Sequence, residues 1–264
     1  MRAVTRTLRL SVGTLLHAQD RTEALIAKVV SDEAARAAAE VSKKRERRAA
    51  VIAALLLASE RLATAATAGI VRGRTLARDA ATDRLVAELD DLGIDAASLR
   101  RSASRPLVAA ARRERAHEDT LHAESAGSAL AGQWRAVAVA SALGAMNRDR
   151  DPVDAVAKTP ALMRARVLRT ATTESTVAYN SEHAEAIADA VRYDGDLADK
   201  FAELEVMREW SAMIDACEKC WPLDGERVEV GETFSGGNEP GHVHAHCRCI
   251  EILVSEAASL RKAA

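Results

Sequence analysis

The sequence predicts a mainly α-helical protein with elongated helices in its N-terminal part and a small α+β unit at its C-terminus. Three observations support this fold class. Trp134 is the only aromatic residue before position 179, so the first two thirds must pack through Ala, Leu and Val, which permit close helix contact. No glycine lies between positions 13 and 69. Five of the thirteen glycines fall in residues 225–241, beside short alternating segments that are typical of strands.

The segment from about Gln19 to Thr67 predicts one or two long helices, because neither proline nor glycine interrupts it. Strong helix formers dominate its middle part. That part also contains a basic cluster, whose ordinary interpretation is a solvated helix face and whose alternative is contact with nucleic-acid phosphates. The cluster consists of Lys43, Lys44, Arg45, Arg47 and Arg48.

Shorter helices are expected next. Asp95 can cap a helix after the turn DDLG, and Ser104 with Pro106 can start another. The stretch SALAGQWRAVAVASALGAMN predicts a further helix, and the polar stretch NRDRDPVDAVAKTP predicts a loop that can separate two structural units. We therefore divide the chain into a long-helix region, 1–150, and a C-terminal domain, 151–264.

The C-terminal domain is expected to begin with a helix over Leu162–Val191. Apolar residues at spacings of three and four then predict an amphipathic helix over Leu197–Ala216, with Phe201 and Trp210 in its buried stripe. The stretches RVEV and CRCIEILV alternate like short strands, and a glycine-rich loop between them predicts a β-hairpin.

Charge is distributed unevenly along the chain. The net charge is −2, but residues 1–120 carry 22 Lys/Arg against 16 Asp/Glu and residues 121–264 carry 15 against 23. A basic front half can touch nucleic acid while an acidic back half meets another protein, although solvated helix faces are the simpler interpretation. The longest apolar run, Ala49–Ala58, is about half the length of a membrane span, so no membrane segment is expected.

The start of the chain does not have the pattern of a secretory signal, because Ser, Gly, Thr and His interrupt its apolar residues. Thiols of a chain that is not exported stay reduced. Clustered cysteines in that setting hold a metal more often than they form disulfides.

All four cysteines lie in two short runs, Cys217-x-x-Cys220 and Cys247-x-Cys249. Two pairs that arrive from separate points suit a tetrahedral zinc ion, which would staple the predicted hairpin within residues 215–255. The shell is either four thiolates or three thiolates with the imidazole of His244, leaving Cys249 outside. Thiols or disulfides without metal, and a catalytic metal, are the other interpretations.

Three histidines in the run HVHAH raise an enzymatic alternative. His242, His244 and His246 could hold a catalytic ion with open coordination positions, which would make the chain a metal-dependent nuclease or hydrolase. No carboxylate occupies an obvious base position beside them, since Glu239 and Glu251 flank the run at a distance. A non-enzymatic role is therefore favoured.

The two cysteine pairs and the residues around them resemble the C-terminal signature of the phage Mu F-like family of minor head proteins. This family is also called the phage head morphogenesis domain. The signature combines a Trp, a C-x-x-C, an LDG turn, a Phe before a loop rich in glycine or proline, and H-x-x-C-R-C before a last strand. An upstream helix of the type R-T-E-x-x-x-A-x-N completes it. The matching residues are Trp210, Cys217, Cys220, Leu223, Asp224, Gly225, Phe234, His244, Cys247, Arg248 and Cys249, with Arg169, Glu174, Ala178 and Asn180 upstream.

The resemblance covers about residues 160–255. It implies a virion protein of few copies, associated with the portal vertex inside the phage head and present in the host cytoplasm during assembly. Such a protein acts in head assembly, DNA packaging or DNA release without catalysing a reaction. The expected partners are a portal protein, a capsid or scaffold protein, and packaged double-stranded DNA bound without sequence preference.

Overall fold

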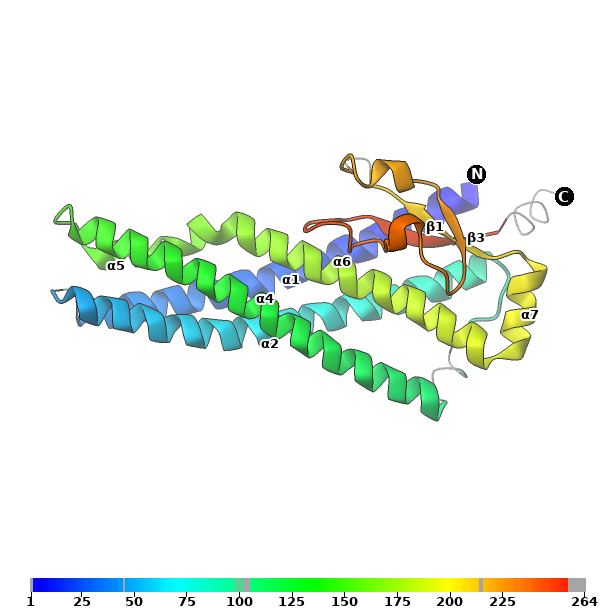
Figure 1. The fold of residues 1–264 in the computed structure, drawn as a ribbon, viewed down its shortest axis with the longest axis horizontal. Coiled ribbons are helices and arrows are strands. Elements are labelled where there is room, and N and C mark those ends of the chain that lie inside the picture. The colour runs from blue at the N-terminus through cyan, green and yellow to red at the C-terminus, as the bar shows by residue number, and fades with distance from the viewer. Residues whose placement is uncertain are drawn as a thin grey trace. The chain divides into compact units, whose positions relative to one another are not determined.

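The computed structural model describes residues 2–44, 46–97, 99, 101, 105–213 and 216–255, with side chains from residue 13 onward. The fold is mainly helical and carries one small antiparallel sheet near the C-terminus, as the sequence predicts (Figure 1). The helices are α1 (Arg2–Ser42), α2 (Arg48–Asp91), α4 (Pro106–Met146), α5 (Pro152–Ala157), α6 (Thr159–Tyr193) and α7 (Gly195–Glu203). The strands are β1 (Met207–Ser211), β2 (Arg227–Glu229) and β3 (Ile250–Val254).

The chain forms two compact units, and each is built from segments that are far apart in sequence. We call Asp20–Gly73 with Glu118–Ala171 the helical unit, and Met1–Gln19 with Arg74–His117 and Thr172–Ala264 the sheet-bearing unit. The compact units therefore do not divide at residue 150. The physical reason is that α1, α2, α4 and α6 each contribute residues to both units.

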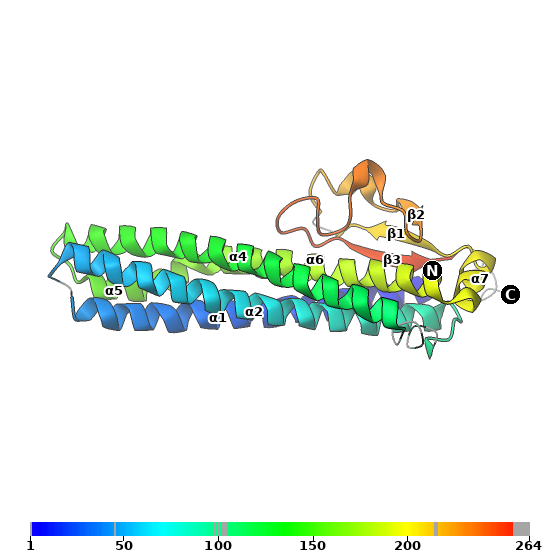
Figure 2. The same cartoon turned by 60° about the horizontal axis from the view of Figure 1, so that its bottom comes forward.

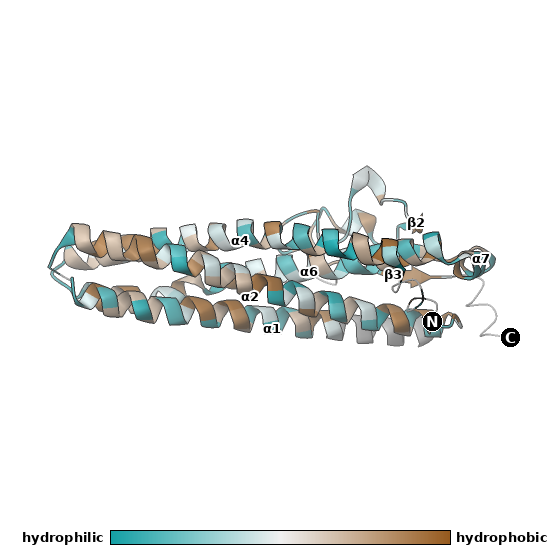
Figure 3. Cartoon of the chain, turned by 90° about the horizontal axis from the view of Figure 1, so that it is seen from below, coloured by the Kyte–Doolittle hydropathy of each residue, from teal (hydrophilic) through white to brown (hydrophobic). Residues whose placement is uncertain are grey.

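The helical unit has a core of alanine and aliphatic side chains with one aromatic residue. Trp134 is fully buried, and its indole N–H donates to the hydroxyl of Thr159 at 3.0 Å. Small residues allow the helices to approach closely: a Cβ at Gly127 of α4 would come within 2.9 Å of the backbone nitrogen of Thr67 in α2. Figure 3 shows hydrophilic and hydrophobic residues interleaved along α1, α2 and α4, as expected of helices with one buried face.

Helix starts in the chain follow ordinary capping chemistry. The predicted polar loop around residue 152 contains the short helix α5, whose N-cap Asp151 accepts a hydrogen bond from the N–H of Val153, with Pro152 at the first helical position. Pro106 begins α4, as predicted, while Ser104 lies outside the described residues. The carboxylate of Asp95 accepts from the N–H of Ala97.

The sheet-bearing unit contains the sheet, in which the strand order is β2-β1-β3 and both pairings are antiparallel (Figure 2). The predicted amphipathic helix over Leu197–Ala216 is wrong in its second half. Helix α7 ends at Glu203 because Glu205 adopts a left-handed conformation, with φ of 49°, and the chain then enters β1. Trp210 is buried as predicted, but it belongs to the central strand, opposite Glu251 of β3.

The two predicted C-terminal strands exist, but they do not form a hairpin with each other. Strand β1 lies between them and pairs with both. The sheet packs on helices of the same unit, with Ile250 and Ile252 of β3 in one apolar cluster with Ala178 and Tyr179 of α6.

Side chains cover the outer edge of β3. Asn180 of α6 donates to the carbonyl of Cys249 at 3.0 Å and accepts from the N–H of Glu251 at 3.2 Å, while Arg84 of α2 donates to the carbonyl of Glu251. These contacts satisfy backbone groups that would otherwise form an open sheet edge.

By length and composition alone, one described helix, α2, is apolar enough to cross a membrane, with a window of mean hydropathy 1.6. The core helix of a soluble protein passes the same test. Val51, Leu55 and Leu62 of this helix are fully buried in the core of the helical unit.

Candidate metal centre

The first half of the centre is a tight turn that follows β1. The backbone N–H of Cys220 and that of Trp221 both donate to the carbonyl of Cys217, at 2.9 and 3.1 Å. A 3₁₀ turn over Trp221–Leu223 follows, and Gly225 then adopts a positive φ of 78°, which explains the glycine of the LDG turn. This backbone arrangement places the Cys217 and Cys220 sulfurs 3.8 Å apart.

The second half is a loop that lies against α6. Gly241 has φ of 90°, and a Cβ there would come within 3.2 Å of the backbone of Val177, so any other residue would be strained at this close approach. The N–H of His246 donates to the hydroxyl of Thr173 at 2.8 Å. Together with the contact from Asn180 to Cys249, these interactions fix the loop that carries His244, Cys247 and Cys249.

The two halves meet, as the cysteine spacing predicts. His244 Nε2 lies 3.1 Å from the Cys217 sulfur and 3.3 Å from that of Cys220, and the Cys220 and Cys247 sulfurs are 3.9 Å apart. A tetrahedral thiolate site with metal–sulfur bonds of about 2.3 Å separates its sulfurs by about 3.8 Å. The donors are therefore spaced as ligands of one ion.

Five donors are available for an ion that takes four. They form two overlapping groups of three, Cys217 with Cys220 and His244, and Cys220 with Cys247 and Cys249, within which all donor atoms lie inside 4.8 Å. Cys220 belongs to both groups, so it is the central ligand in either predicted shell. His244 is prepared for coordination through Nε2, because its Nδ1–H donates to the carbonyl of Ala245 at 2.8 Å.

Proton affinities differ sharply among the thiols. The hydrogen bond from the Cys249 thiol, opposed by burial, lowers the pKa of Cys247 to about 5, and the same contact raises the pKa of Cys249. Burial and the neighbouring Cys247 raise the pKa of Cys220 to about 12. The pKa values of neighbouring thiols separate in this way because adjacent thiolates repel each other. A cation bound among them would remove that repulsion.

Only one histidine of the run HVHAH joins the cluster. His242 is exposed, with Nε2 3.5 Å from the Ser181 hydroxyl, and His246 is also exposed. Among the described residues, neither belongs to a group of donors that could hold a metal. In the part of the chain that the structure describes, the arrangement thus brings together cysteine sulfurs and one imidazole rather than three histidines.

An apolar cluster lies beside the thiols. Trp210 and Phe234 pack edge to face with ring centroids 5.3 Å apart, and both are buried with Cys220, Cys247 and Cys249. Trp221, next to Cys220 in the sequence, is 50% exposed and is not part of this cluster. The apolar cover of the thiols comes from the central strand and the loop.

Comparison with known protein families, with curated proteins and with solved structures finds no match to this chain. The site is therefore interpreted from its own geometry.

A buried network of charged residues in the sheet-bearing unit has no counterpart among the sites predicted from the sequence. The imidazole of His183 on α6 is 0% exposed and lies between two carboxylates, with Nε2 2.6 Å from Glu88 of α2 and Nδ1 2.7 Å from Glu251 of β3. Arg84 pairs with Glu88, and Arg208 of β1 pairs with Glu251. The only local signal in the sequence was the i,i+4 pair of Arg84 and Glu88.

The proton affinities of this network follow from burial opposed by opposite charges. Desolvation lowers the pKa of His183, but Glu88 and Glu251 outweigh it, so the pKa is raised. Desolvation raises the pKa of Glu251, but His183 and Arg208 outweigh it, so the pKa is lowered. The network is thus a chain of alternating charges.

The remaining predicted site residues lie elsewhere. The basic cluster is not on a helix face: Lys43, Lys44 and Arg47 are exposed in the turn between α1 and α2, and Arg48 is exposed at the first position of α2. Arg45 lies outside the described residues. Glu174 pairs with Arg74 of α2 at 2.7 Å, which fits a structural role for this acidic position.

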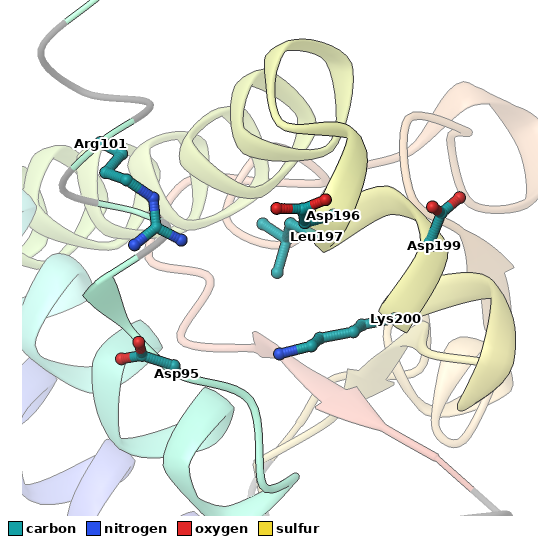
Figure 4. A pocket seen from close by; sticks show the side chains of 6 residues that line it. All are labelled: Asp95, Arg101, Asp196, Leu197, Asp199 and Lys200. Carbon is teal, nitrogen blue, oxygen red and sulfur yellow. The ribbon is translucent and has the colours of Figure 1, made fainter.

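Each unit also has a concave surface among its described residues. A pocket of about 380 Å³ is lined by Asp95, Arg101, Asp196, Leu197, Asp199 and Lys200 of the sheet-bearing unit (Figure 4). A larger one of about 730 Å³ lies in the helical unit, beside Arg148, Asp154 and Leu162. Charges of both signs line each of them, so neither selects a ligand class.

Proposed function

We propose that this chain is a non-enzymatic minor head protein of a phage, acting at the portal vertex inside the capsid in head assembly, DNA packaging or DNA release. The observation that carries the proposal is the convergence of Cys217 and Cys220 with His244 and Cys247, because the resemblance to the phage head morphogenesis domain rests on the same residues. Asn180, from the upstream part of the signature, supports it by contacting Cys249 directly.

Zinc is the metal we propose for the centre. Thiolate and imidazole donors at tetrahedral spacing favour zinc over the hard cations, which prefer oxygen. Four protein ligands leave no open position for a substrate, which is consistent with a structural role. The ion would join the turn after β1 to the loop on α6.

Elemental analysis of the purified full chain tests the metal. One equivalent of zinc is expected, and it should be lost in Cys220→Ser, because Cys220 takes part in both predicted shells. His242→Gln is the matched control, since His242 is exposed in the same loop and belongs to neither donor group. A metal-free wild-type chain would contradict the zinc proposal.

Copurification with a portal ring tests the assembly role. Co-expression of the tagged chain with portal and capsid proteins of the phage that encodes it should yield a complex of defined stoichiometry. A chain that binds neither protein would contradict this role. Cleavage of plasmid DNA with Mg²⁺, Mn²⁺ or Zn²⁺, lost in His242→Gln and His246→Gln, would establish the enzymatic alternative instead.

A further inference from the structure

We propose that His183 is a proton-dependent latch that holds the C-terminal sheet on the helices of the sheet-bearing unit. The ring joins three elements: it comes from α6, and it contacts Glu88 of α2 and Glu251 of β3. Neither His183 nor its two carboxylate partners is a proposed metal ligand, and the latch does not rest on the assembly role proposed above.

The hydrogen-bond geometry determines the number of protons. Carboxylate oxygens lie 2.6 Å from Nε2 and 2.7 Å from Nδ1, and each contact needs one hydrogen between its two heavy atoms. A neutral imidazole carries one N–H and can supply only one of these bonds. With both carboxylates ionised, the two contacts therefore require an imidazolium ion, with both ring nitrogens donating.

The surrounding charges keep this proton on the ring. Arg84 donates to the Oε1 atom of Glu88 from its Nε at 2.8 Å, and Arg208 donates to the Oε2 atom of Glu251 from its Nε at 2.9 Å. In each carboxylate, one oxygen accepts from an arginine, which stabilises the ionised form. The other oxygen faces the histidine ring and attracts the imidazolium.

Charge balance explains why losing the proton matters. Three cations, Arg84, His183 and Arg208, alternate with three anions, Glu88, Glu251 and Glu239, the last 2.6 Å from Arg208. Tyr179 of α6, which contacts Arg84 at 3.4 Å, is a further titratable side chain at the network. Removing one proton leaves a net negative charge at a fully buried position and breaks one of the two bonds.

The sign of the pH dependence follows from linkage. The folded protein holds the His183 proton more tightly than the unfolded chain, whose histidines titrate near their ordinary pKa of about 6.5. The stabilisation is fully present below that pH and is lost as the pH rises through the higher pKa of the folded state. Alkaline conditions therefore release the latch.

The full chain labelled with ¹⁵N-histidine and 5-fluorotryptophan tests this inference in the presence of zinc. At pH 7.5 the His183 ring should show the nitrogen shifts of imidazolium. As the pH rises further, the signal of buried Trp210 should change together with the loss of that proton. Trp134 reports on the helical unit in the same sample and should stay constant over that range.

Two variants separate the latch from thiol titration. Glu88→Gln removes one carboxylate acceptor of the imidazolium. The midpoint of the Trp210 transition should therefore move to lower pH, by at least a tenfold change in proton concentration. A transition caused by titration of the thiols would keep its midpoint in this variant. His122→Gln, at an exposed histidine of α4, is the matched control and should leave the midpoint unchanged. A neutral His183 ring at pH 7.5, or a Trp210 signal that is indifferent to loss of the proton, would overturn the proposal.

Discussion

The helical unit and the sheet-bearing unit of this chain are stabilised by different chemistry. Of the buried polar and charged residues in the described part of the chain, five belong to the helical unit and fifteen to the sheet-bearing unit. The helical unit is held by alanine and aliphatic contacts, which tolerate change if volume is preserved. The sheet-bearing unit depends on ion pairs and thiols, where removing one partner leaves another group without compensation.

The difference follows from the size of the elements. Four long helix segments bury a continuous apolar core in the helical unit. The strands are only three to five residues long, and the loops around them are rich in glycine. Such a segment cannot bury enough apolar surface on its own, so specific polar contacts, and the metal proposed for the centre, would contribute the missing free energy.

Loss of the metal should have the largest effect, and it should be confined to the sheet-bearing unit. Structural zinc contributes on the order of 10 kcal/mol in small modules. We expect zinc removal, or Cys220→Ser, to abolish hydrogen-exchange protection around residues 216–225, while the helical core stays protected. Equal loss of protection in both units would contradict the contrast between them.

Removal of a buried carboxylate should have the next largest effect, and it can be compared between the units. Glu251→Ala removes one carboxylate from both His183 and Arg208, which keep Glu88 and Glu239 respectively, and leaves a buried excess of positive charge. We therefore expect a loss of about 3–5 kcal/mol in chemical denaturation. Glu33 in the helical unit is equally buried, but its partner Arg61 is 40% exposed and can be hydrated once the carboxylate is gone. Glu33→Ala should therefore cost only about 1 kcal/mol.

Close helix packing should be the sensitive feature of the helical unit. Gly127→Ala places a methyl group 2.9 Å from the Thr67 nitrogen and 3.0 Å from the Ala63 carbonyl oxygen, so α2 and α4 must separate. We expect a loss of about 1–3 kcal/mol in thermal or chemical unfolding. In the same helix, a Cβ at Gly132 meets nothing within 4 Å. Gly132→Ala should accordingly stabilise the protein by up to about 1 kcal/mol.

Much of the fold could be predicted because its signals are local. The absence of proline and glycine predicted the long helices, and the spacing of the cysteines predicted which donors converge. Strand β1 was missed because Phe201, Leu204 and Trp210 also satisfy a helical spacing, and a five-residue strand is too short to show its own period of two. Helix α7 ends where Glu205 adopts a left-handed backbone conformation, and glutamate is not a residue type that predicts this conformation.

The buried network could not be predicted, because its members come from five separate segments of the chain. A histidine at position 183 and a glutamate at position 251 look like ordinary helix and strand residues until the fold brings them within 2.7 Å. The two compact units likewise combine segments that are distant in sequence. Loops with proline mark the ends of helices, whereas compactness depends on which helix segments pack together.

Changes in the basic turn should have the smallest effect on stability, and they separate binding from folding. Lys43, Lys44, Arg47 and Arg48 are exposed, so replacing all four with Ser should change unfolding free energy by less than about 0.5 kcal/mol per residue. The helical unit carries 17 Lys/Arg against 13 Asp/Glu, and residues 43–48 alone, with five basic residues and one acidic residue, account for this excess of positive charge.

If the turn contacts packaged DNA, retention of the protein on duplex DNA should fall steeply with salt concentration, and the four-residue variant should lose most of that salt dependence. Replacement of exposed Arg113 and Arg135 of α4 is the matched control and should leave DNA retention nearly unchanged, whereas equal losses in both variants would assign any binding to overall charge rather than to the turn.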